Sequence, residues 1–230
     1  MGKRIEPMRA GVDRDRKPAI VAGVVVAVVV LAGCGLFAWH EQPSFCNALC
    51  HAPMDPYVAT YDQEYGASGV DKWGNEVEST SGMLAVSHKQ QGMNCLSCHV
   101  PTLQEQVSEG IEWVSYGFDV PTPLVERDCD DLTRPRAVEQ DEACLNENCH
   151  NYTREELADL PAVRDMKYNP HAAQHNEMAG LNVQTSCSDC HKSHRASVMY
   201  CTKCHVDADV PDGWITEQQD VALRRQLSEC

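Results

Sequence analysis

The sequence predicts a mainly α-helical protein with extensive loop, in which one N-terminal transmembrane helix precedes a single compact domain. Three observations lead to this fold class. A run of 21 uncharged residues lies near the N-terminus, five similar clusters of cysteine and histidine recur in the rest of the chain, and no segment has the alternating pattern of a strand. For a chain of 230 residues we expect one domain with a small appendage.

The uncharged run extends from Ala19 to Trp39, which is long enough to cross a bilayer core of about 30 Å. Basic residues outnumber acidic residues before the run, so the positive-inside rule keeps the start of the chain in the cytoplasm. We therefore expect a cytoplasmic tail over residues 1–17, a transmembrane anchor over 18–39 and an extracytoplasmic domain over 40–230, held at the cell membrane.

An alternative for the same segment stays open. Leu31–Cys34, followed by glycine, has the form of a lipoprotein cleavage box, in which the leader is removed before Cys34 and a lipid is added to its thiol. Apolar character continues through Leu36, Phe37 and Trp39, which favours the uncleaved anchor. With either anchor, the domain is tied to the outer face of a membrane.

Beyond the anchor, a few short patterns predict local structure. Residues 62–85 are rich in glycine and serine, which indicates an exposed insertion. Apolar residues recur at helical spacing after residue 102, so we expect an amphipathic helix that packs on the domain or, alternatively, lies on a lipid surface. These residues are Leu103, Val107, Ile111 and Val114. Capping boxes predict two further helices, one opening at Thr153 with Glu156 and running toward Met166, the other opening near the C-terminus at Thr216 with Gln219.

Five clusters in the exported part pair two cysteines with an immediately following histidine. They are Cys46/Cys50/His51, Cys95/Cys98/His99, Cys144/Cys149/His150, Cys187/Cys190/His191 and Cys201/Cys204/His205. In a C-x-x-C-H segment the two thiols add across the vinyl groups of a porphyrin, and the histidine lies under the iron as an axial ligand. The sequence therefore predicts five covalent c-type haems and a multihaem cytochrome c domain over residues 40–230.

The five clusters differ in spacing. Three have two residues between the thiols, whereas the first has three and the third has four, a looped-out variant. Zinc is the alternative ligand for cysteine and histidine. A closed zinc site, however, assembles four ligands from two separated pairs and does not require a histidine after every second cysteine, so we favour haem.

Composition agrees with this interpretation. The exported part has few aromatic residues, so its side chains alone would form only a small hydrophobic core. Five haem macrocycles would supply the missing apolar interior. The net charge of −15 argues against a nucleic-acid partner. Three cysteines, Cys34, Cys129 and Cys230, lie outside the clusters; we expect free thiols, with a Cys129–Cys230 disulfide as the alternative.

Three segments resemble a known family. Phe45–Met54 has the form F-C-x-x-x-C-H-x-x-M, His88–Pro101 has the form H-x-x-x-G-x-x-C-x-x-C-H-V-P, and His175–His194 contains the fourth cluster between histidines. They are similar to haem segments of the NapC/NirT/NrfH family of membrane-anchored multihaem cytochromes, which oxidise membrane quinols. The family commonly has four haems, so a count of four is the alternative to five. The extra residue in the first cluster and the 62–85 segment are further departures.

The resemblance also implies axial ligands. Met54 would serve the first haem, in place of or together with His51, and His88 and His194 would each cap another haem. Either His171 or His175 would cap a further one, and we prefer His175 for its position before Cys187. Bis-histidine ligation gives an iron of low potential that is suited to electron transfer.

We therefore expect a quinol dehydrogenase that relays electrons from membrane (mena)quinol to an extracytoplasmic reductase. Quinol oxidation also releases protons, and Asp55 and Lys89 are candidate acceptors because they lie near Met54 and His88 in the sequence. By resemblance the partner is a flavoprotein reductase, which we prefer, or a nitrite or nitrate reductase. The sequence has no dinucleotide-binding glycine motif, so the final reduction belongs to another polypeptide.

Two alternatives stay open. The chain is an electron conduit without its own quinol site, or it is a haem enzyme that reduces a small substrate directly. The second needs an iron with an open position, whereas all five clusters end in histidine. The sequence leaves the identity of the acceptor and the oligomeric state undecided.

Overall fold

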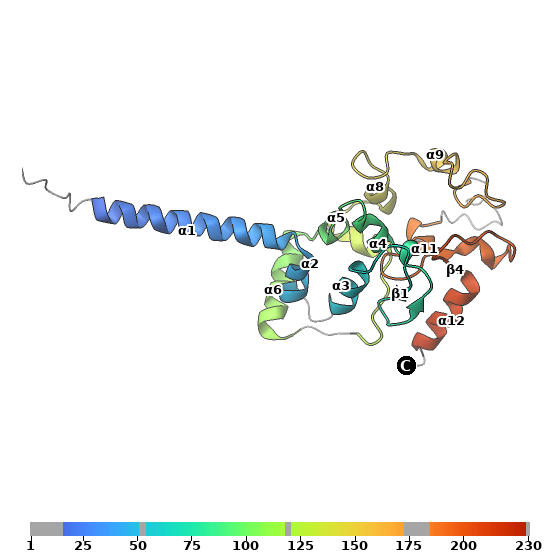
Figure 1. The fold of residues 1–230 in the computed structure, drawn as a ribbon, viewed down its shortest axis with the longest axis horizontal. Coiled ribbons are helices and arrows are strands. Elements are labelled where there is room, and N and C mark those ends of the chain that lie inside the picture. Colours follow the sequence, from blue (N-terminus) through green and yellow to red (C-terminus); the bar gives the residue numbers. More distant parts are fainter. Residues whose placement is uncertain (1–15, 51–53, 118–120, 173–184, 229–230) are drawn as a thin grey trace, which may run out of the picture. The chain divides into compact units, whose positions relative to one another are not determined.

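The computed structural model describes residues 16–50, 54–117, 121–172 and 185–228. It divides into two units, Met1–His40 and Glu41–Cys230. The predicted fold class is confirmed, because the described chain is mostly short helices and loops after one long apolar helix (Figure 1).

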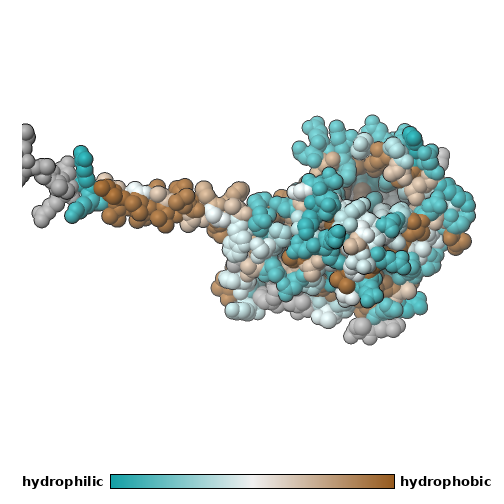
Figure 2. Space-filling view, in the orientation of Figure 1, coloured by the Kyte–Doolittle hydropathy of each residue, from teal (hydrophilic) through white to brown (hydrophobic). Residues whose placement is uncertain are grey.

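The first unit is the long helix α1 (Arg16–His40), in which no residue is buried. It is long and apolar enough to cross a membrane, and the same length and composition suit a signal sequence. Figure 2 shows α1 as a nearly continuous apolar surface, whereas the second unit exposes mainly polar residues with scattered apolar ones.

The second unit is built from many short helical segments. In chain order they are α2 (Pro43–Phe45), η1 (Cys46–Cys50), α3 (Asp55–Tyr61), η3 (Thr80–Gly82), α4 (Leu84–Lys89), α5 (Cys95–Cys98), α6 (Leu103–Ser115), α7 (Cys129–Thr133), η4 (Arg134–Arg136), α8 (Gln140–Cys144), α9 (Arg154–Ala158), α11 (Cys187–Cys190), η5 (Tyr200–Lys203) and α12 (Glu217–Ser228). Within this unit α4 packs against α3, and α12 packs against η5.

Four two-residue strands were not expected from the sequence. Strands β1 (Gly69–Val70) and β2 (Glu76–Val77) pair antiparallel, and β3 (Val198–Met199) and β4 (Ile215–Thr216) pair parallel. The sequence shows no strand pattern, and these pairs are too short to produce one. Two residues are too few to show a two-residue alternation, so the sequence carries no periodic signal for such strands.

The prediction of an exposed insertion is only partly right, because residues 64–66, 74, 76 and 78 are exposed while residues 71–72, 79–80 and 82–83 are buried. Met83 and Val86 are fully buried, and Val198 and Met199 of β3, far along the chain, are buried as well. The backbone N–H groups of Leu84 and Ala85 donate to the carbonyls of residues 192 and 193, at 2.9 and 3.1 Å, which joins the two segments.

Small and polar residues allow parts of this irregular segment to be buried. The side chain of Asp71 accepts hydrogen bonds from the backbone N–H groups of Trp73 and Asn75, at 2.8 and 2.9 Å. A Cβ on Gly82 would lie 2.0 Å from the carbonyl oxygen of Gly213, so only glycine permits this approach. The glycines and polar groups that resemble a surface loop in the sequence are here turn and packing residues.

The two helices that capping boxes predicted begin where expected, and one of them is shorter than expected. Thr216 and Gln219 cap α12 with reciprocal hydrogen bonds. Thr153 caps α9 together with Glu156, but α9 ends at Ala158 and does not continue to Met166. Pro161 explains the early end, because a residue before proline is disfavoured in the helical conformation.

The amphipathic helix after the second cluster is confirmed as α6. Thr102 and Glu105 form its capping box, a signal that sequence reasoning had not used. All four apolar residues that predicted α6 are exposed in the described structure, with Leu103 at 76% and Val114 at 72%. Its apolar face is therefore not covered by the described protein chain.

Candidate haem-binding site

Each C-x-x-C-H cluster is built on one tight turn. In the second, fourth and fifth clusters the backbone N–H of the histidine donates to the carbonyl of the first cysteine, at 2.8, 2.9 and 2.8 Å. Asn94 and Ser186 cap the turns of α5 and α11. Residues three and four apart on such a turn share a face, so both thiols and the imidazole are presented together.

The third cluster keeps this arrangement despite its longer spacing. The backbone N–H of His150 still donates to the Cys144 carbonyl, at 3.1 Å, although five residues lie between the two. A separate turn closed by Cys149 N–H and the Asn146 carbonyl, at 3.1 Å, takes up the extra residues. The insertion is thus looped out, as its sequence indicates. In the first cluster Cys46–Cys50 forms the wider turn η1, and His51 lies outside the described residues.

Thiols of consecutive clusters lie beside one another. A hydrogen bond to Cys46 raises the pKa of Cys95, and in the same way a hydrogen bond to Cys144 raises the pKa of Cys187. The pKa of Cys98 is raised by burial and, to a smaller extent, by the charge of Cys149. The pKa of Cys190 is raised to about 11, mainly by burial and also by the charge of Cys201. Hydrogen bonds therefore link the first cluster to the second and the third to the fourth, and charge interactions link the second to the third and the fourth to the fifth.

Three histidines that end a cluster face a histidine from elsewhere in the chain. The ring centroids of His88 and His150 are 6.1 Å apart, those of His99 and His194 are 6.5 Å apart, and those of His171 and His191 are 6.2 Å apart. Two imidazoles that bind opposite faces of one iron, through metal–nitrogen bonds of about 2 Å, have centres roughly 6 Å apart. The centroid separations of the three pairs therefore match the spacing of two imidazoles on one iron.

The environment of these rings favours their neutral form, which an iron ligand requires. Burial, together with the neighbouring His171, lowers the pKa of His191 to about 4. Burial likewise lowers the pKa of His194 to about 3, helped by His99. The ring atom Nδ1 of His171 is buried and has no hydrogen-bond partner in the described structure, which is consistent with a missing ligand there.

The fifth cluster differs from the second, third and fourth clusters, whose histidines each face another histidine. His205 stacks on Tyr168 with a centroid separation of 4.0 Å and an interplanar angle of 19°, which leaves no room for an iron between the rings. The Tyr168 hydroxyl donates to Asp207 at 3.1 Å. His175, the ligand preferred from the sequence, lies outside the described residues, and among the described ones His171 faces a cluster histidine instead.

The remaining predicted site residues lie near the first cluster. Met54 is half-buried and precedes α3, whose first residue Asp55 is exposed. Lys89 ends α4 and forms an ion pair with Asp62 at 3.0 Å. Sequence reasoning had not identified Asp62, because no local pattern links it to Lys89.

Other residues around the clusters were also missed. Arg154 pairs with Asp141 and lies 3.9 Å from the Cys187 sulfur, while the Cys187 thiol donates to Asp141 at 3.5 Å. This pair therefore supports the third and fourth clusters where they adjoin. Thr60 contacts His194 from α3, with its Oγ1 2.7 Å from Nδ1. A single threonine far from any motif gives no sequence signal for this contact.

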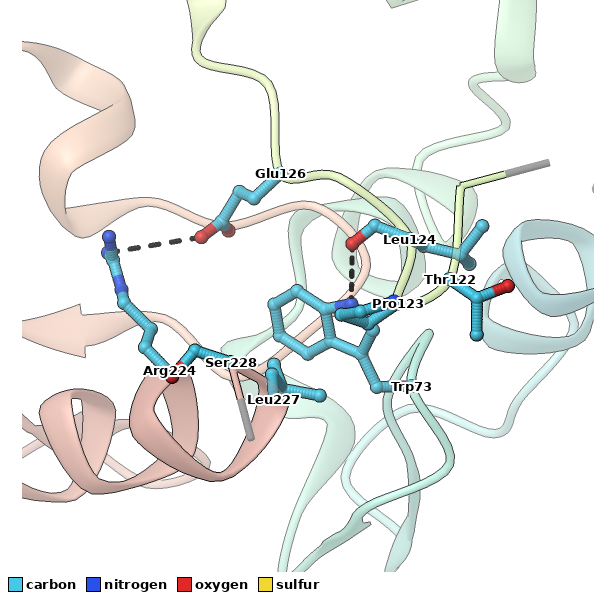
Figure 3. Close-up of a pocket in the computed structure, with 8 residues that line it drawn as sticks. All are labelled: Trp73, Thr122, Pro123, Leu124, Glu126, Arg224, Leu227 and Ser228. Atoms are coloured by element: carbon cyan, nitrogen blue, oxygen red, sulfur yellow. Dashed lines mark hydrogen bonds and ion pairs between the residues drawn. The ribbon is translucent and has the colours of Figure 1, made fainter. Parts of the chain in front are cut away.

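An open cavity of about 430 Å³ lies apart from the clusters (Figure 3). The indole of Trp73 forms one wall and donates to the Leu124 carbonyl at 2.8 Å, and Arg224 lies at the other end beside Glu126. The cavity is lined by Trp73, Thr122, Pro123, Leu124, Glu126, Arg224, Leu227 and Ser228. No cluster residue lines it, so it is separate from the candidate haem sites.

Known proteins resemble this chain in two ways. Residues 126–206, which contain the third, fourth and fifth clusters, match the family described as Cytochrome c3. The chain is 57% identical to "Cytochrome c-type protein Cgr1" of Eggerthella lenta over 213 residues, which cover 92% of this chain and 94% of that protein. No solved structure matches.

Proposed function

The chain belongs to the family of multihaem c-type cytochromes that includes Cytochrome c-type protein Cgr1, and on this premise we propose a specific role in electron transfer. It is a membrane-anchored carrier that takes electrons from a membrane (mena)quinol and delivers them to an extracytoplasmic reductase. Covalently bound haem supplies the one-electron redox chemistry. The protein residues attach the haems, fix their axial ligands and set their order.

The three facing histidine pairs carry this proposal. We assign His99 with His194, His150 with His88, and His191 with His171 as axial pairs, because their separations of 6.1 to 6.5 Å suit one iron each. Two imidazoles occupy both axial positions and leave none open for a substrate. This arrangement favours an electron carrier over an enzyme that reduces a small molecule at these three sites.

The order of the clusters supports a single line of five haem sites. Each cluster presents a thiol next to a thiol of the next cluster, so attachment points of successive haems adjoin. The ten cluster cysteines provide the ten thioether bonds that five haems need. The remaining cysteine of the described domain, Cys129, lies beside Cys144 and belongs to no cluster.

The quinol end of the line is assigned to the first cluster. It follows directly on the apolar helix α1 in the sequence, and the resemblance to the NapC/NirT/NrfH family supports Met54 as a ligand there. Quinol oxidation releases two protons for two electrons, so nearby groups must accept protons. The exposed carboxylate of Asp55 and the Lys89–Asp62 ion pair are suited to this.

The final acceptor is proposed to be a separate exported flavoprotein reductase, with a nitrite or nitrate reductase as the other candidate. The absence of a dinucleotide-binding glycine motif in this sequence supports a second polypeptide for the substrate chemistry.

Anaerobic titration with menaquinol tests the proposal. The full-length protein, carrying its haems in detergent or lipid nanodiscs, is expected to be reduced rapidly, and a quinol-analogue inhibitor is expected to block the reduction. An Asp55→Asn variant should slow reduction by quinol but not by dithionite, and Asp165→Asn, which changes an exposed carboxylate elsewhere, is the matched control. Reduction by dithionite without any reduction by menaquinol would instead identify a conduit fed by another membrane protein.

A further inference from the structure

A buried hydroxyl contacts the histidine that we assign to the second haem. Thr60 lies on α3 with 1% of its surface exposed, and its Oγ1 is 2.7 Å from Nδ1 of His194, which is 134 residues further along the chain. Among the described residues, no other side chain forms a hydrogen bond to the His194 ring. The contact is therefore the main polar constraint on the orientation of that ring.

The direction of this hydrogen bond follows from the number of available protons. A threonine hydroxyl has one proton, and Thr60 donates it to the Tyr57 carbonyl at 2.8 Å, an oxygen that can only accept. In its contact with His194, Thr60 Oγ1 must therefore accept a hydrogen bond, so Nδ1 of His194 carries the proton. A neutral imidazole with its proton on Nδ1 has its free lone pair on Nε2.

The rest of the pocket fits a neutral, oriented ring. Tyr57 contacts the His194 ring edge-on with a centroid separation of 5.1 Å, and the His194 backbone carbonyl accepts from Lys72 N–H at 2.9 Å. Burial keeps the imidazole uncharged, as its lowered pKa also indicates. Backbone, ring edge and Nδ1 are thus all fixed, and the His99 ring centroid lies 6.5 Å from that of His194.

We propose that Thr60 is a positioning residue that holds His194 in the Nδ1–H tautomer, so that the Nε2 lone pair faces the iron shared with His99. This rests on the proposed assignment of His194 as an axial ligand. Metal-bound histidines generally donate their second N–H to an oxygen, which fixes the ring and makes the ligand a better electron donor. A better donor stabilises the oxidised iron, so Thr60 lowers the reduction potential of that haem.

Three threonine variants test the role of the acceptor. Thr60→Val keeps the shape but removes the acceptor, Thr60→Ser keeps the acceptor, and Thr133→Val changes a buried threonine whose hydroxyl has no hydrogen-bond partner in the described residues. The full-length haem-loaded proteins are compared by redox titration and by the low-spin signals in electron paramagnetic resonance. Intact mass confirms equal haem content, and Thr60→Ala replaces Thr60→Val if the valine protein does not load fully.

We expect Thr60→Val to raise the midpoint potential of one haem and to shift its low-spin signal, with the other haems unchanged. Thr60→Ser should restore the wild-type signal, and Thr133→Val should leave every signal unchanged. A Thr60→Val protein with all haem signals and potentials as in the wild type would overturn the proposal. So would a serine variant that behaves like the valine variant.

A fourth variant separates this inference from the ligand assignment. His194→Met should replace one bis-histidine signal by a histidine–methionine signal, and that signal should be the one that Thr60→Val shifts. If His194→Met changes no haem, the assignment of His194 is wrong and the role of Thr60 is overturned with it. If His194→Met changes one haem that Thr60→Val leaves untouched, the assignment holds and only the role of Thr60 is overturned.

Discussion

At the scale of single residues, Arg195 is the most deeply buried charge described. Its guanidinium donates to both carboxylate oxygens of Glu126, at 2.5 and 2.9 Å, and lies 2.8 Å from Asp220. Glu126 precedes α7 and Asp220 belongs to α12, so one side chain joins three parts of the domain that are distant in the sequence. Removing one partner of such a group leaves the others buried and unpaired, which costs more than the net energy of the pair.

Arg195→Met is therefore expected to lower the free energy of unfolding by about 3 to 5 kcal/mol. Denaturant unfolding of the haem-loaded protein, followed by the Soret band, measures the change. Arg225→Met, which alters an exposed arginine on α12, is the control and should change stability by no more than about 0.5 kcal/mol. Equal effects of the two substitutions would contradict a structural role for the buried group.

Glu126 makes the stabilisation from the Arg195–Glu126–Asp220 contacts depend on pH. Burial raises its pKa, but the hydrogen bonds from Arg195 and the charges of Arg195, Lys192 and Lys72 lower it more, so the pKa in the folded protein is below the ordinary 4.5. The unfolded chain therefore takes up this proton first as the pH falls. The stabilisation from Glu126 is complete above pH 4.5 and is lost as the pH drops through its folded pKa.

Glu126→Gln should lower stability at neutral pH and flatten the decline of stability below pH 4.5. Unfolding free energies measured over a series of acidic buffers test this, with Glu147→Gln as an exposed control. An unchanged acid slope in the Glu126 variant would show that other carboxylates dominate the dependence.

At the scale of elements, local sequence signals predicted helix starts better than helix ends or burial. Capping boxes located α9 and α12 correctly because the cap is a contact between residues three apart. The burial of residues 79–80 and 82–83 was not predictable in this way, because it depends on hydrogen bonds to residues 192, 193 and 197 and on the close approach of Gly82 and Gly213. Such contacts join residues more than one hundred positions apart and leave no periodic trace in either segment.

The capping box of α6 gives a prediction at this scale. Thr102→Ala removes the acceptor for the Glu105 N–H and should destabilise the helix by about 1 kcal/mol. Since the apolar face of α6 is uncovered in the described domain, the effect should appear as local opening, with amide exchange over 103–115 faster by about fivefold. Hydrogen–deuterium exchange with mass spectrometry measures this, and Gln104→Ala on the exposed face is the control. Exchange that is equally fast in both variants would contradict it.

At the scale of the whole molecule, the sequence predicted the chemistry of the candidate site but only part of its geometry. The five clusters followed from local spacing, whereas the tight turns of the second to fifth clusters are a finding of the structure. The pairing of His88 with His150 and of His171 with His191 did not, because each pair is made by the tertiary fold. His175 was preferred over His171 on sequence position alone, whereas His171 is the described ring that faces a cluster.

The fifth cluster provides the test of the haem count. Cys201→Ala combined with Cys204→Ala should remove one haem from five and leave the three histidine pairs assigned above spectroscopically unchanged. Intact mass and a pyridine haemochrome assay measure the loss, and Cys129→Ala, which changes a cysteine outside the clusters, should retain all haems. If the double variant binds as much haem as the wild type, the fifth cluster carries none and the count is four.

The scarcity of buried apolar side chains has a consequence for how much of this protein a cell can keep. In the described domain they are Met83, Val86, Ala196, Val198, Met199 and Ala208, too few to hold 190 residues closed without bound macrocycles. Chains that have not yet received haem are therefore expected to stay open to proteolysis, so the rate of haem attachment limits how much folded protein accumulates.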